Sequence, residues 1–600
     1  MQKAIYTIVG IDELLSHVQA LKGVGARFVQ MHAERNVDDG TYRLVYTFIN
    51  VRAAQEHIVQ DGNYAIENLV VEGIDQCQEI PSISSYYPAV FPFENEAHDL
   101  FGLAITDMQI DFKGFFYQVS TAEPMSVITP EVKAAREKAM KVRAAAEAKA
   151  RKAAAEKAAA AAAGEGAAST GDAAGAAAQP AATAGSDASM TMMLRRPRSR
   201  LPRWRQSSPP WIPRKRPRSA RRLPPRPPAT SRKRRRKVHG SSLRNSVWPA
   251  APGAARAASS GPVIEDDRVI EAIPQIGFVH RGLEKLTEKR DMHQFGYIAE
   301  RICGICAVGH SCGYASACER MLGIEVPGRV QYIRTILHEL SRIHSHLLWL
   351  GLLADAFGFE ALFYRSWTLR EQILKIFEST CGGRVILSIN EIGGLKHDIE
   401  DSELAGIVQT LDAMRPDYEA VVHTFLDDNS CGERLHSVGV ISKKDALDLS
   451  MVGPFGRASG VDYDVRMFGD GAYADLAAFE PIVATDGDCY ARCQVRCAEV
   501  TQAMDIIKEL VGKIPHDGIG GRTKLTPADG ARGEVVIEQP RGEAYYYVRG
   551  NGTKNLDRFR VRTPTSQNLA GLTHALQGVL LANVPMIILT IDPCISCTER

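Results

Sequence analysis

"ERICGICAVGHSC" at residues 300–312 and "DPCISCTER" at residues 592–600 carry the strongest structural signal in this sequence. Each contains a Cys-x-x-Cys pair. The four cysteines are Cys303, Cys306, Cys594 and Cys597. This spacing lets two sulfurs of a single turn bind one metal site, and two pairs together make a four-thiolate cage. We therefore expect the end of the chain to fold back onto the start of the same domain.

The segment before the terminal pair, "GVLLANVPMIILTIDPC" at residues 578–594, is a long apolar run with β-branched stretches. It predicts a buried strand that carries the tail into the core. A loose tail would expose its thiols to random oxidation unless a ligand held them. The run also contains Asn583 and Pro585 and is too short to cross a bilayer. We expect both terminal cysteines to lie inside the protein.

The composition is that of a soluble globular protein with several domains, since 45% of its 600 residues are hydrophobic and 24% are charged. The start, "MQKAIYTIVGIDELL", has no signal-peptide pattern. Twelve cysteines are too few for a disulfide scaffold in a chain of this length. Cys-x-x-Cys pairs in such a chain indicate metal or redox work in a reducing compartment, so we expect it to fold in the cytoplasm.

A small α/β domain is predicted at residues 1–122. "GIDELLSHVQALKG", residues 10–23, has apolar residues at helical spacing and a glycine at its end, which predicts a helix. "YRLVYTFINV", residues 42–51, alternates as a strand does.

Residues 123–262 predict a linker. The Ala/Lys/Glu run at residues 130–164 has high helix propensity but few large apolar residues, so it predicts a solvated helix or a disordered segment. The Arg/Pro/Ser-rich sequence that follows cannot build a core. Globular sequence resumes at residues 263–600 and is rich in helical patterns, for example at residues 329–358. The whole chain is therefore predicted to be α+β, with a large, mainly helical second domain.

Two kinds of metal site fit four thiolates: a structural zinc site and a redox metal centre. Three features favour the redox centre. The flanks are not short polar knuckles, and the domain is too large to need a metal for its stability. Charged residues also flank both pairs, namely Glu300, Arg301 and Asp592.

"ERICGIC" together with "DPCISC" closely resembles the paired motifs of the nickel-iron hydrogenase large subunit. Other segments resemble its membrane-bound, energy-converting class, which is related to a peripheral-arm subunit of respiratory complex I. They are "GFVHRGLEK", "RIHSHLLWLGL", "VGPFGRASGVDYDVR" and "RFRVRTPTSQNL". In the first domain, "ENEAHDLFGLAI" resembles the small peripheral-arm subunit of complex I, which is fused to such hydrogenases in formate hydrogenlyase. The complex I homologues of the large domain have lost the four cysteines.

The resemblance implies a nickel-iron centre whose iron carries carbon monoxide and cyanide. Cys303 and Cys594 would bind nickel terminally, while Cys306 and Cys597 would bridge nickel to iron. Cys594 also matches the family's candidate base for the proton.

Further residues match the surroundings of that centre. Arg541 in "EQPRGEAYYY" matches an arginine above the centre, and Asp592 matches the carboxylate that orients it; a structural ion pair is the alternative. His310 follows Cys306 by one helical turn and is predicted either to bond a ligating sulfur or to be an ordinary core histidine. The family pattern places His344 and His346 at the electron-partner interface.

The resemblance implies the catalytic subunit of a hydrogenase that splits or forms dihydrogen. Cys489, Cys493 and Cys497 are expected in the core, and Cys312 and Cys318 have no matching role, so no cysteine set is left for an iron-sulfur cluster. Electrons would therefore pass to an iron-sulfur small subunit.

Ferredoxin-like and membrane-arm subunits are further expected partners, and no nucleic acid is expected. The first domain is expected to dock against neighbouring subunits and to have no catalytic role. The complex of all these subunits is expected to lie on the cytoplasmic face of the inner membrane. The alternative is a catalytically silent scaffold subunit of the NADH/quinone oxidoreductase type.

The sequence departs from the family where a "G-P-Q-H-P" motif should precede the large domain. We expect residues 190–261 to be a frame-shifted translation, because an alanine-coding stretch of a GC-rich gene yields Arg and Pro codons out of frame. A basic arm for nucleic acid or acidic lipid, anchored by "SRKRRRK", is the alternative. Arg600 stands where family precursors are cleaved, which predicts a mature product or a member without an extension.

Overall fold

A computed structural model describes most of the chain outside the predicted linker. The described residues are 3–36, 39–49, 65–112, 114, 116, 117, 125, 263–468, 471–521 and 525–600. The linker predicted at residues 123–262, with the frame shift expected in it, lies outside these residues apart from Met125.

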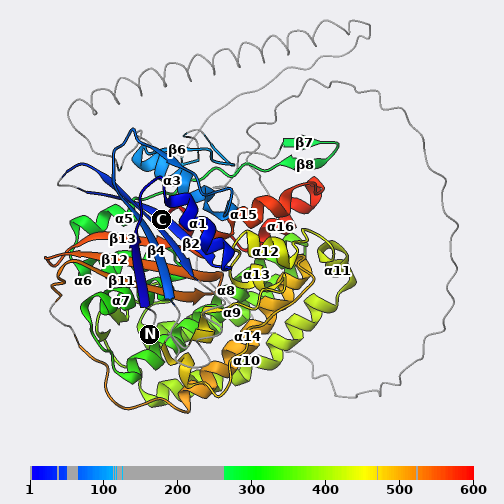
Figure 1. The fold of residues 1–600 in the computed structure, drawn as a ribbon. Coiled ribbons are helices and arrows are strands. Elements are labelled where there is room, and N and C mark those ends of the chain that lie inside the picture. The colour runs from blue at the N-terminus through cyan, green and yellow to red at the C-terminus, as the bar shows by residue number, and fades with distance from the viewer. Residues whose placement is uncertain are drawn as a thin grey trace, which may run out of the picture. The chain divides into compact units, whose positions relative to one another are not determined.

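The first part of the chain folds as a four-stranded sheet with helices (Figure 1). The strands run in the order β1 (Lys3–Ile8), β4 (Ala65–Ile74), β3 (Tyr42–Ile49) and β2 (Arg27–Arg35). β1 is parallel to β4, and the other pairs are antiparallel. The helix predicted at residues 10–23 is α1 (Leu14–Gly23), and the strand predicted at residues 42–51 is β3.

Helix α3 (Phe91–Phe101) carries the "ENEAHDLF" sequence and is almost wholly buried. It ends at Gly102, whose φ of 74° is the left-handed conformation that glycine adopts at the end of many helices. Glu94 accepts hydrogen bonds from Ile83 N at 2.9 Å and Ser82 Oγ at 2.6 Å. Burial raises the pKa of Glu94 to about 7. Glu94 therefore serves the fold of this domain.

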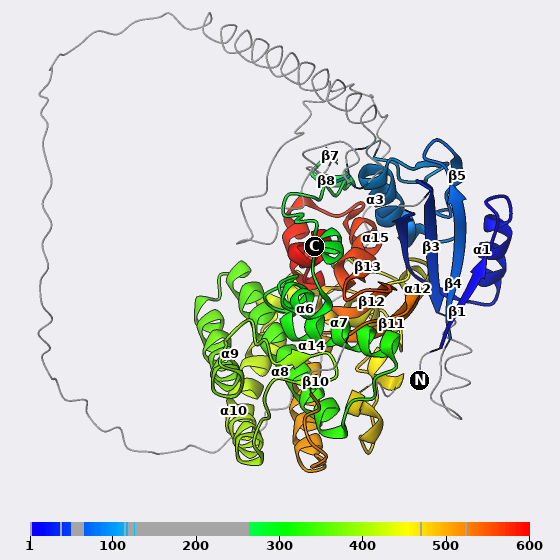
Figure 2. The same cartoon turned by 90° about the vertical axis from the view of Figure 1, so that its left-hand side faces the viewer.

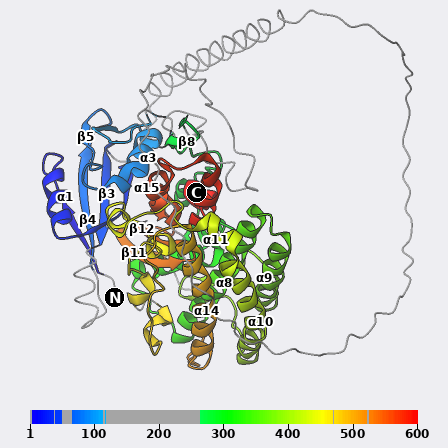
Figure 3. The ribbon, with the colours of Figure 1, turned by 90° about the vertical axis from the view of Figure 1, so that its right-hand side faces the viewer.

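The second part of the chain is built on long helices (Figure 2 and Figure 3). These are α8 (Gly328–Ala356), α9 (Glu360–Cys381), α10 (Asp401–Asp427) and α14 (Cys489–Val511). α8 packs against α9 and α14, and α10 packs against the same two helices. Ile333, Leu337 and Leu340 recur at helical spacing along α8 and are fully buried, which is why the helix predicted at residues 329–358 forms in the core.

An antiparallel sheet of β11 (Asp529–Gln539), β12 (Gly542–Asn551) and β13 (Leu556–Arg562) accompanies these helices. Gln539 pairs with Gly542, so Pro540 and Arg541 form a two-residue turn. Gly542 has a φ of 128°, and a Cβ there would lie 2.8 Å from the backbone of Gly453. Only glycine fits this position, and the tight turn projects Arg541 from the end of the hairpin.

The chain ends in helices α15 (Pro564–Leu576), α16 (Val584–Ile591) and α17 (Ile595–Glu599). The strand predicted before Cys594 is therefore wrong, because this run is α16. Pro585 stands in its first turn, where proline favours a helix, and Val584, Ile587 and Ile591 are buried at helical spacing. Burial on one helix face outweighs the β propensity of these side chains.

The described chain is α+β, as predicted. Among its described helices, none combines the length and the hydropathy needed to cross a bilayer.

Candidate metal centre

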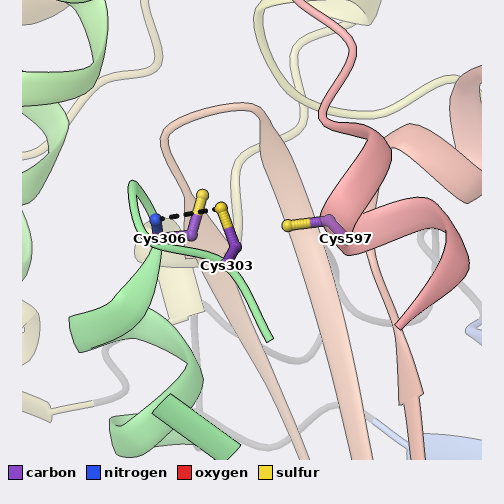
Figure 4. Close-up of side chains that lie close together, drawn as sticks. All are labelled: Cys303, Cys306 and Cys597. Carbon is purple, nitrogen blue, oxygen red and sulfur yellow. Dashed lines mark hydrogen bonds between the residues drawn. The ribbon is translucent and has the colours of Figure 1, made fainter. Parts of the chain in front are cut away.

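The four cysteines predicted as ligands lie together and are buried. Cys303 lies in the turn after α6 (Met292–Glu300), and Cys306 directly precedes α7 (Ala307–Leu322). The sulfurs of Cys303 and Cys594 are 3.3 Å apart, and those of Cys303, Cys306 and Cys597 all lie within 4.8 Å of one another. Figure 4 shows the side chains of these last three converging from opposite sides. The fold thus brings the two ends of the domain together, as the pairs predict.

Backbone groups favour negative charge on the first sulfur. Ile305 N and Cys306 N donate to Cys303 Sγ at 3.3 and 3.4 Å. Contacts with the thiols of Cys306 and Cys594 lower the pKa of Cys303 well below its usual range. The same contact with Cys303 raises the pKa of Cys594 to about 12. The two backbone N–H groups therefore stabilise negative charge at Cys303 Sγ.

Arg541 reaches the cluster from the hairpin turn. Its Nη1 donates to Cys306 Sγ at 3.4 Å and to Ser345 Oγ at 3.0 Å. Its Nη2 donates to Asp592 Oδ1 and its Nε to Asp592 O, both at 2.9 Å. Asp592 has a φ of 58°, and this left-handed conformation ends α16. The predicted pairing of Arg541 with Asp592 is present, and it fixes the plane of the guanidinium.

The second carboxylate oxygen of Asp592 does not bind Arg541. Burial raises the pKa of Asp592, against the opposing effect of Arg541. Its Oδ2 is buried and has no hydrogen-bond partner among the described residues. A buried carboxylate oxygen without a partner is costly, so this acceptor marks a place where a ligand or its proton could be held.

His310 contacts the cluster from α7. Its Nε2 lies 3.4 Å from Cys597 Sγ, and its Nδ1 lies 2.9 Å from Tyr546 Oη. Tyr546 Oη also accepts from Gln539 Nε2 at 2.7 Å and lies 3.4 Å from Gly309 O. Burial lowers the pKa of His310 to about 4, which keeps the ring neutral. The contact predicted between His310 and a sulfur of the cluster is present.

Several contacts of the cluster were not predicted from the sequence. Thr565 Oγ1 accepts from Cys594 N at 3.0 Å, and Thr563 Oγ1 donates to Cys597 O at 3.1 Å. Both threonines lie in "RFRVRTPTSQNL", which resembles the family but gave no role to single residues.

Arg281 bridges the two Cys-x-x-Cys segments, and this role was also missed. Its Nη1 donates to Arg301 O at 2.8 Å, and its Nη2 to Ile302 O at 2.8 Å and Ser596 O at 3.2 Å. One guanidinium therefore joins the residues before Cys303 to the turn that carries Cys597. Its motif, "GFVHRGLEK", was the only signal in the sequence.

His344 and His346 make their contacts inside the domain. His346 Nε2 lies 3.0 Å from Glu499 Oε2, and His344 Nε2 accepts from Arg370 Nη2 at 2.7 Å. They are 3% and 2% exposed, and burial lowers the pKa of His346 to about 4. Neither side chain reaches the surface of this chain, so a role at a partner interface would have to act through their neighbours.

The other cysteines considered above lie in the core. Cys489, Cys493 and Cys497 are buried on α14 among apolar side chains, as expected. Cys312 and Cys318 are buried on α7, and burial raises the pKa of Cys312 to about 12. In the part of the chain that the structure describes, no second group of three or more potential ligands converges.

Three protein families match this chain. The family "Respiratory-chain NADH dehydrogenase, 49 Kd subunit" matches residues 357–530 and 525–600. The family "Nickel-dependent hydrogenase" matches residues 281–355, which include the first cysteine pair. The family "Respiratory-chain NADH dehydrogenase, 30 Kd subunit" matches residues 8–116.

Curated relatives include both hydrogenases and complex I subunits. The membrane-bound hydrogenase subunit alpha of Pyrococcus furiosus is 35% identical over 56% of this chain and 82% of its own length. The carbon monoxide-induced hydrogenase of Rhodospirillum rubrum is 32% identical over 56% of this chain and 93% of its own length. An NADH-quinone oxidoreductase subunit of Thermodesulfovibrio yellowstonii is 34% identical over 56% of this chain and 91% of its own length.

Both hydrogenases and the complex I subunit thus align with the same share of this chain. The two Cys-x-x-Cys pairs, the family matches and these relatives all indicate the same family. This chain therefore belongs to the family that unites the large subunits of membrane-bound hydrogenases with the 49-kDa subunit of respiratory complex I, and a domain of the 30-kDa subunit family precedes that part.

Proposed function

We propose that this chain is the catalytic large subunit of a membrane-associated nickel-iron hydrogenase. One observation carries the proposal: all four predicted cysteine sulfurs converge in one buried cluster. Arg541 and His310 add polar contacts to two of these sulfurs. A scaffold subunit without a metal would have no use for four buried thiols beside a buried guanidinium.

The residues present fit a nickel-iron centre. Four soft thiolate donors suit nickel and iron, and the cluster holds them with backbone N–H groups and a cation that stabilise negative sulfur. By the family pattern, Cys303 and Cys594 would hold nickel, and Cys306 and Cys597 would hold nickel together with an iron that carries carbon monoxide and cyanide. When bound, this centre would supply the heterolytic cleavage or formation of dihydrogen.

The neighbouring side chains would orient the ligands and handle the proton. Arg541 places a fixed positive charge beside the sulfurs, and Asp592 keeps its rotamer. Cys594 is 8% exposed, whereas none of the other three ligands exceeds 3%. We therefore assign Cys594 Sγ as the base, because it is the sulfur best placed to exchange a proton with solvent.

The proposed partners follow from the Pyrococcus furiosus relative, which by name is a subunit of a membrane-bound hydrogenase. We propose that electrons leave to an iron-sulfur small subunit, because the described residues provide no second set of metal ligands. Ferredoxin-like and membrane-arm subunits would complete a complex on the cytoplasmic face of the inner membrane. We retain 1–122, 123–262 and 263–600 as proposed domain boundaries.

The alternative is a silent scaffold subunit of the NADH/quinone oxidoreductase type. The identity to the Thermodesulfovibrio yellowstonii relative favours it, since it nearly equals the identity to the hydrogenases. Metal analysis and dihydrogen-dependent dye reduction of the purified complex separate the two. Nickel and iron with dye reduction support the hydrogenase; zinc alone, or neither nickel nor iron, would overturn it.

A further inference from the structure

Arg600 is a buried arginine with two buried carboxylate partners. It is 2% exposed. Its Nε donates to Glu284 Oε1 at 2.7 Å, and its Nη2 donates to both carboxylate oxygens of Glu96 at 2.9 Å. Arg600 follows Cys597 by three residues, so this contact lies directly behind the proposed metal ligands.

The two carboxylates come from different parts of the fold. Glu96 lies on α3 of the amino-terminal domain, and Glu284 lies on α5 (Leu283–Leu286) at the start of the large domain. Both also bind Arg560 of β13, which donates to Met31 O as well. Arg558 Nη2 lies 2.9 Å from Glu284 Oε2. We call this group the latch: Glu96, Glu284, Arg558, Arg560 and Arg600.

The turn that carries Cys597 cannot hold its shape alone. α17 (Ile595–Glu599) is a single short turn, and helices of this length are unstable in isolation. Its start is held by Thr565 and by Arg281, which bind Cys594 N and Ser596 O. Near its end, Arg600 Nη1 donates to Thr598 O at 3.0 Å, so the latched guanidinium also ties down the turn.

We propose that Glu96 is a positioning residue for the metal-binding tail. Through Glu96, the amino-terminal domain holds Arg600 and thereby keeps Cys597 in the four-sulfur cluster. The inference rests on the proposed function, because it takes Cys597 as a metal ligand. The amino-terminal domain then does more than dock against neighbouring subunits, since it closes the site from behind.

The charge balance of the latch explains why Glu96 matters. Glu96 and Glu284 are the two carboxylates that pair with both Arg560 and Arg600, so removing Glu96 leaves Glu284 as the one carboxylate bound to these two buried guanidiniums. An uncompensated buried charge is strongly destabilising. Arg558 and Arg560 are fixed in the strand β13, whereas Arg600 follows the five-residue helix α17. Release of Arg600 and its turn is therefore the expected response.

The test compares Glu96→Gln with Glu72→Gln in the full chain within its complex. Glu72 is an exposed carboxylate of the same domain, 3.0 Å from Arg43, and is the matched control. We expect amide hydrogen exchange of residues 594–600 to quicken on the order of a hundredfold in Glu96→Gln, with nickel lost to a chelator. Glu72→Gln should change neither.

Arg600 variants test the latch from its other side, where the amino-terminal domain is left intact. Arg600→Gln should reproduce the faster exchange of residues 594–600, and Arg600→Lys should restore part of the protection because it keeps the charge. The proposal is overturned if Arg600→Gln, or a folded Glu96→Gln, exchanges like the wild type. If Glu96→Gln speeds amide exchange throughout the amino-terminal domain, the substitution has destabilised that whole domain. The exchange of residues 594–600 in Arg600→Gln then decides the proposal.

Failure of the latch and failure of the proposed function give different results. A wild-type chain without nickel contradicts the hydrogenase, but the exchange of residues 594–600 in that metal-free chain still decides the latch. A nickel-containing wild type whose tail ignores both substitutions contradicts the latch and leaves the hydrogenase standing.

Discussion

Replacing Arg541 by Leu should destabilise the metal-free protein through the carboxylate that it leaves behind. Arg541 Nη2 is the donor to Asp592 Oδ1, and Asp592 is 9% exposed. Breaking a buried ion pair by removing one partner costs about 3–5 kcal/mol of the free energy of unfolding. Replacing both partners removes the unpaired charge, so the double variant Arg541→Leu, Asp592→Asn should recover most of that loss. Asp592→Asn alone should be destabilised as well, because it leaves the guanidinium unpaired.

Urea unfolding of the four metal-free chains provides the assay. Trp349 Nε1 donates to Leu589 O at 2.8 Å, so the fluorescence of this tryptophan, one of five in the chain, reports on the packing of α16. The coupling energy from the double-mutant cycle should be about 3 kcal/mol. The reasoning would be refuted if Arg541→Leu cost under about 1 kcal/mol, or if its effect and that of Asp592→Asn simply added, since exposed ion pairs behave in that way.

Three further predictions concern the ligands, their bridge and a buried carboxyl. Cys597→Ser should lose nickel and dihydrogen activity and gain a protease-sensitive tail, whereas Cys493→Ser should do none of this, because a hydroxyl is a poor substitute for a thiolate ligand. Arg281→Ala should lower nickel retention, because the two cysteine segments lose their common donor; nickel content of the purified complex measures it. Burial raises the pKa of Glu534 to about 8, so folding favours its protonated form, and stability should fall as pH rises from 4.5 to about 8. Thermal melts across this window should show a smaller fall in Glu534→Gln.

A specific result would contradict each of these three predictions. A Cys597→Ser chain that kept nickel and activity would disprove the ligand assignment. Arg268→Ala is the control for Arg281→Ala, because its exposed side chain donates to Gly578 O at 2.7 Å; equal nickel loss in both would rule out a specific bridge. An unchanged pH dependence in Glu534→Gln would mean that the carboxyl does not titrate in this window.

The cysteines of the cluster and their nearest neighbours could be predicted from short motifs. The Cys-x-x-Cys pairs indicated the four thiols that cluster, and the helical spacing from Cys306 indicated His310. The family resemblance indicated Arg541 and Asp592. Each of these signals lies within a short stretch of sequence, although Cys303 and Cys594 are 291 residues apart.

The latch and the Arg281 bridge could not be predicted in the same way. Their partners are far apart in the sequence. No pattern in the sequence distinguishes a buried arginine that donates to carbonyls from an exposed one. The helix α16 was missed for a related reason, since its apolar run carries β-branched residues and only its packing on one face makes it helical. Contacts that depend on tertiary packing require the structure.

X-ray absorption at the nickel edge of the purified complex reports both the metal and its ligands. The wild type should contain nearly stoichiometric nickel whose nearest neighbours are sulfur atoms, and Cys597→Ser should lose that signal. A wild-type complex without nickel, or with nickel bound only by nitrogen and oxygen, would contradict the assignment of Cys303, Cys306, Cys594 and Cys597 as the metal centre.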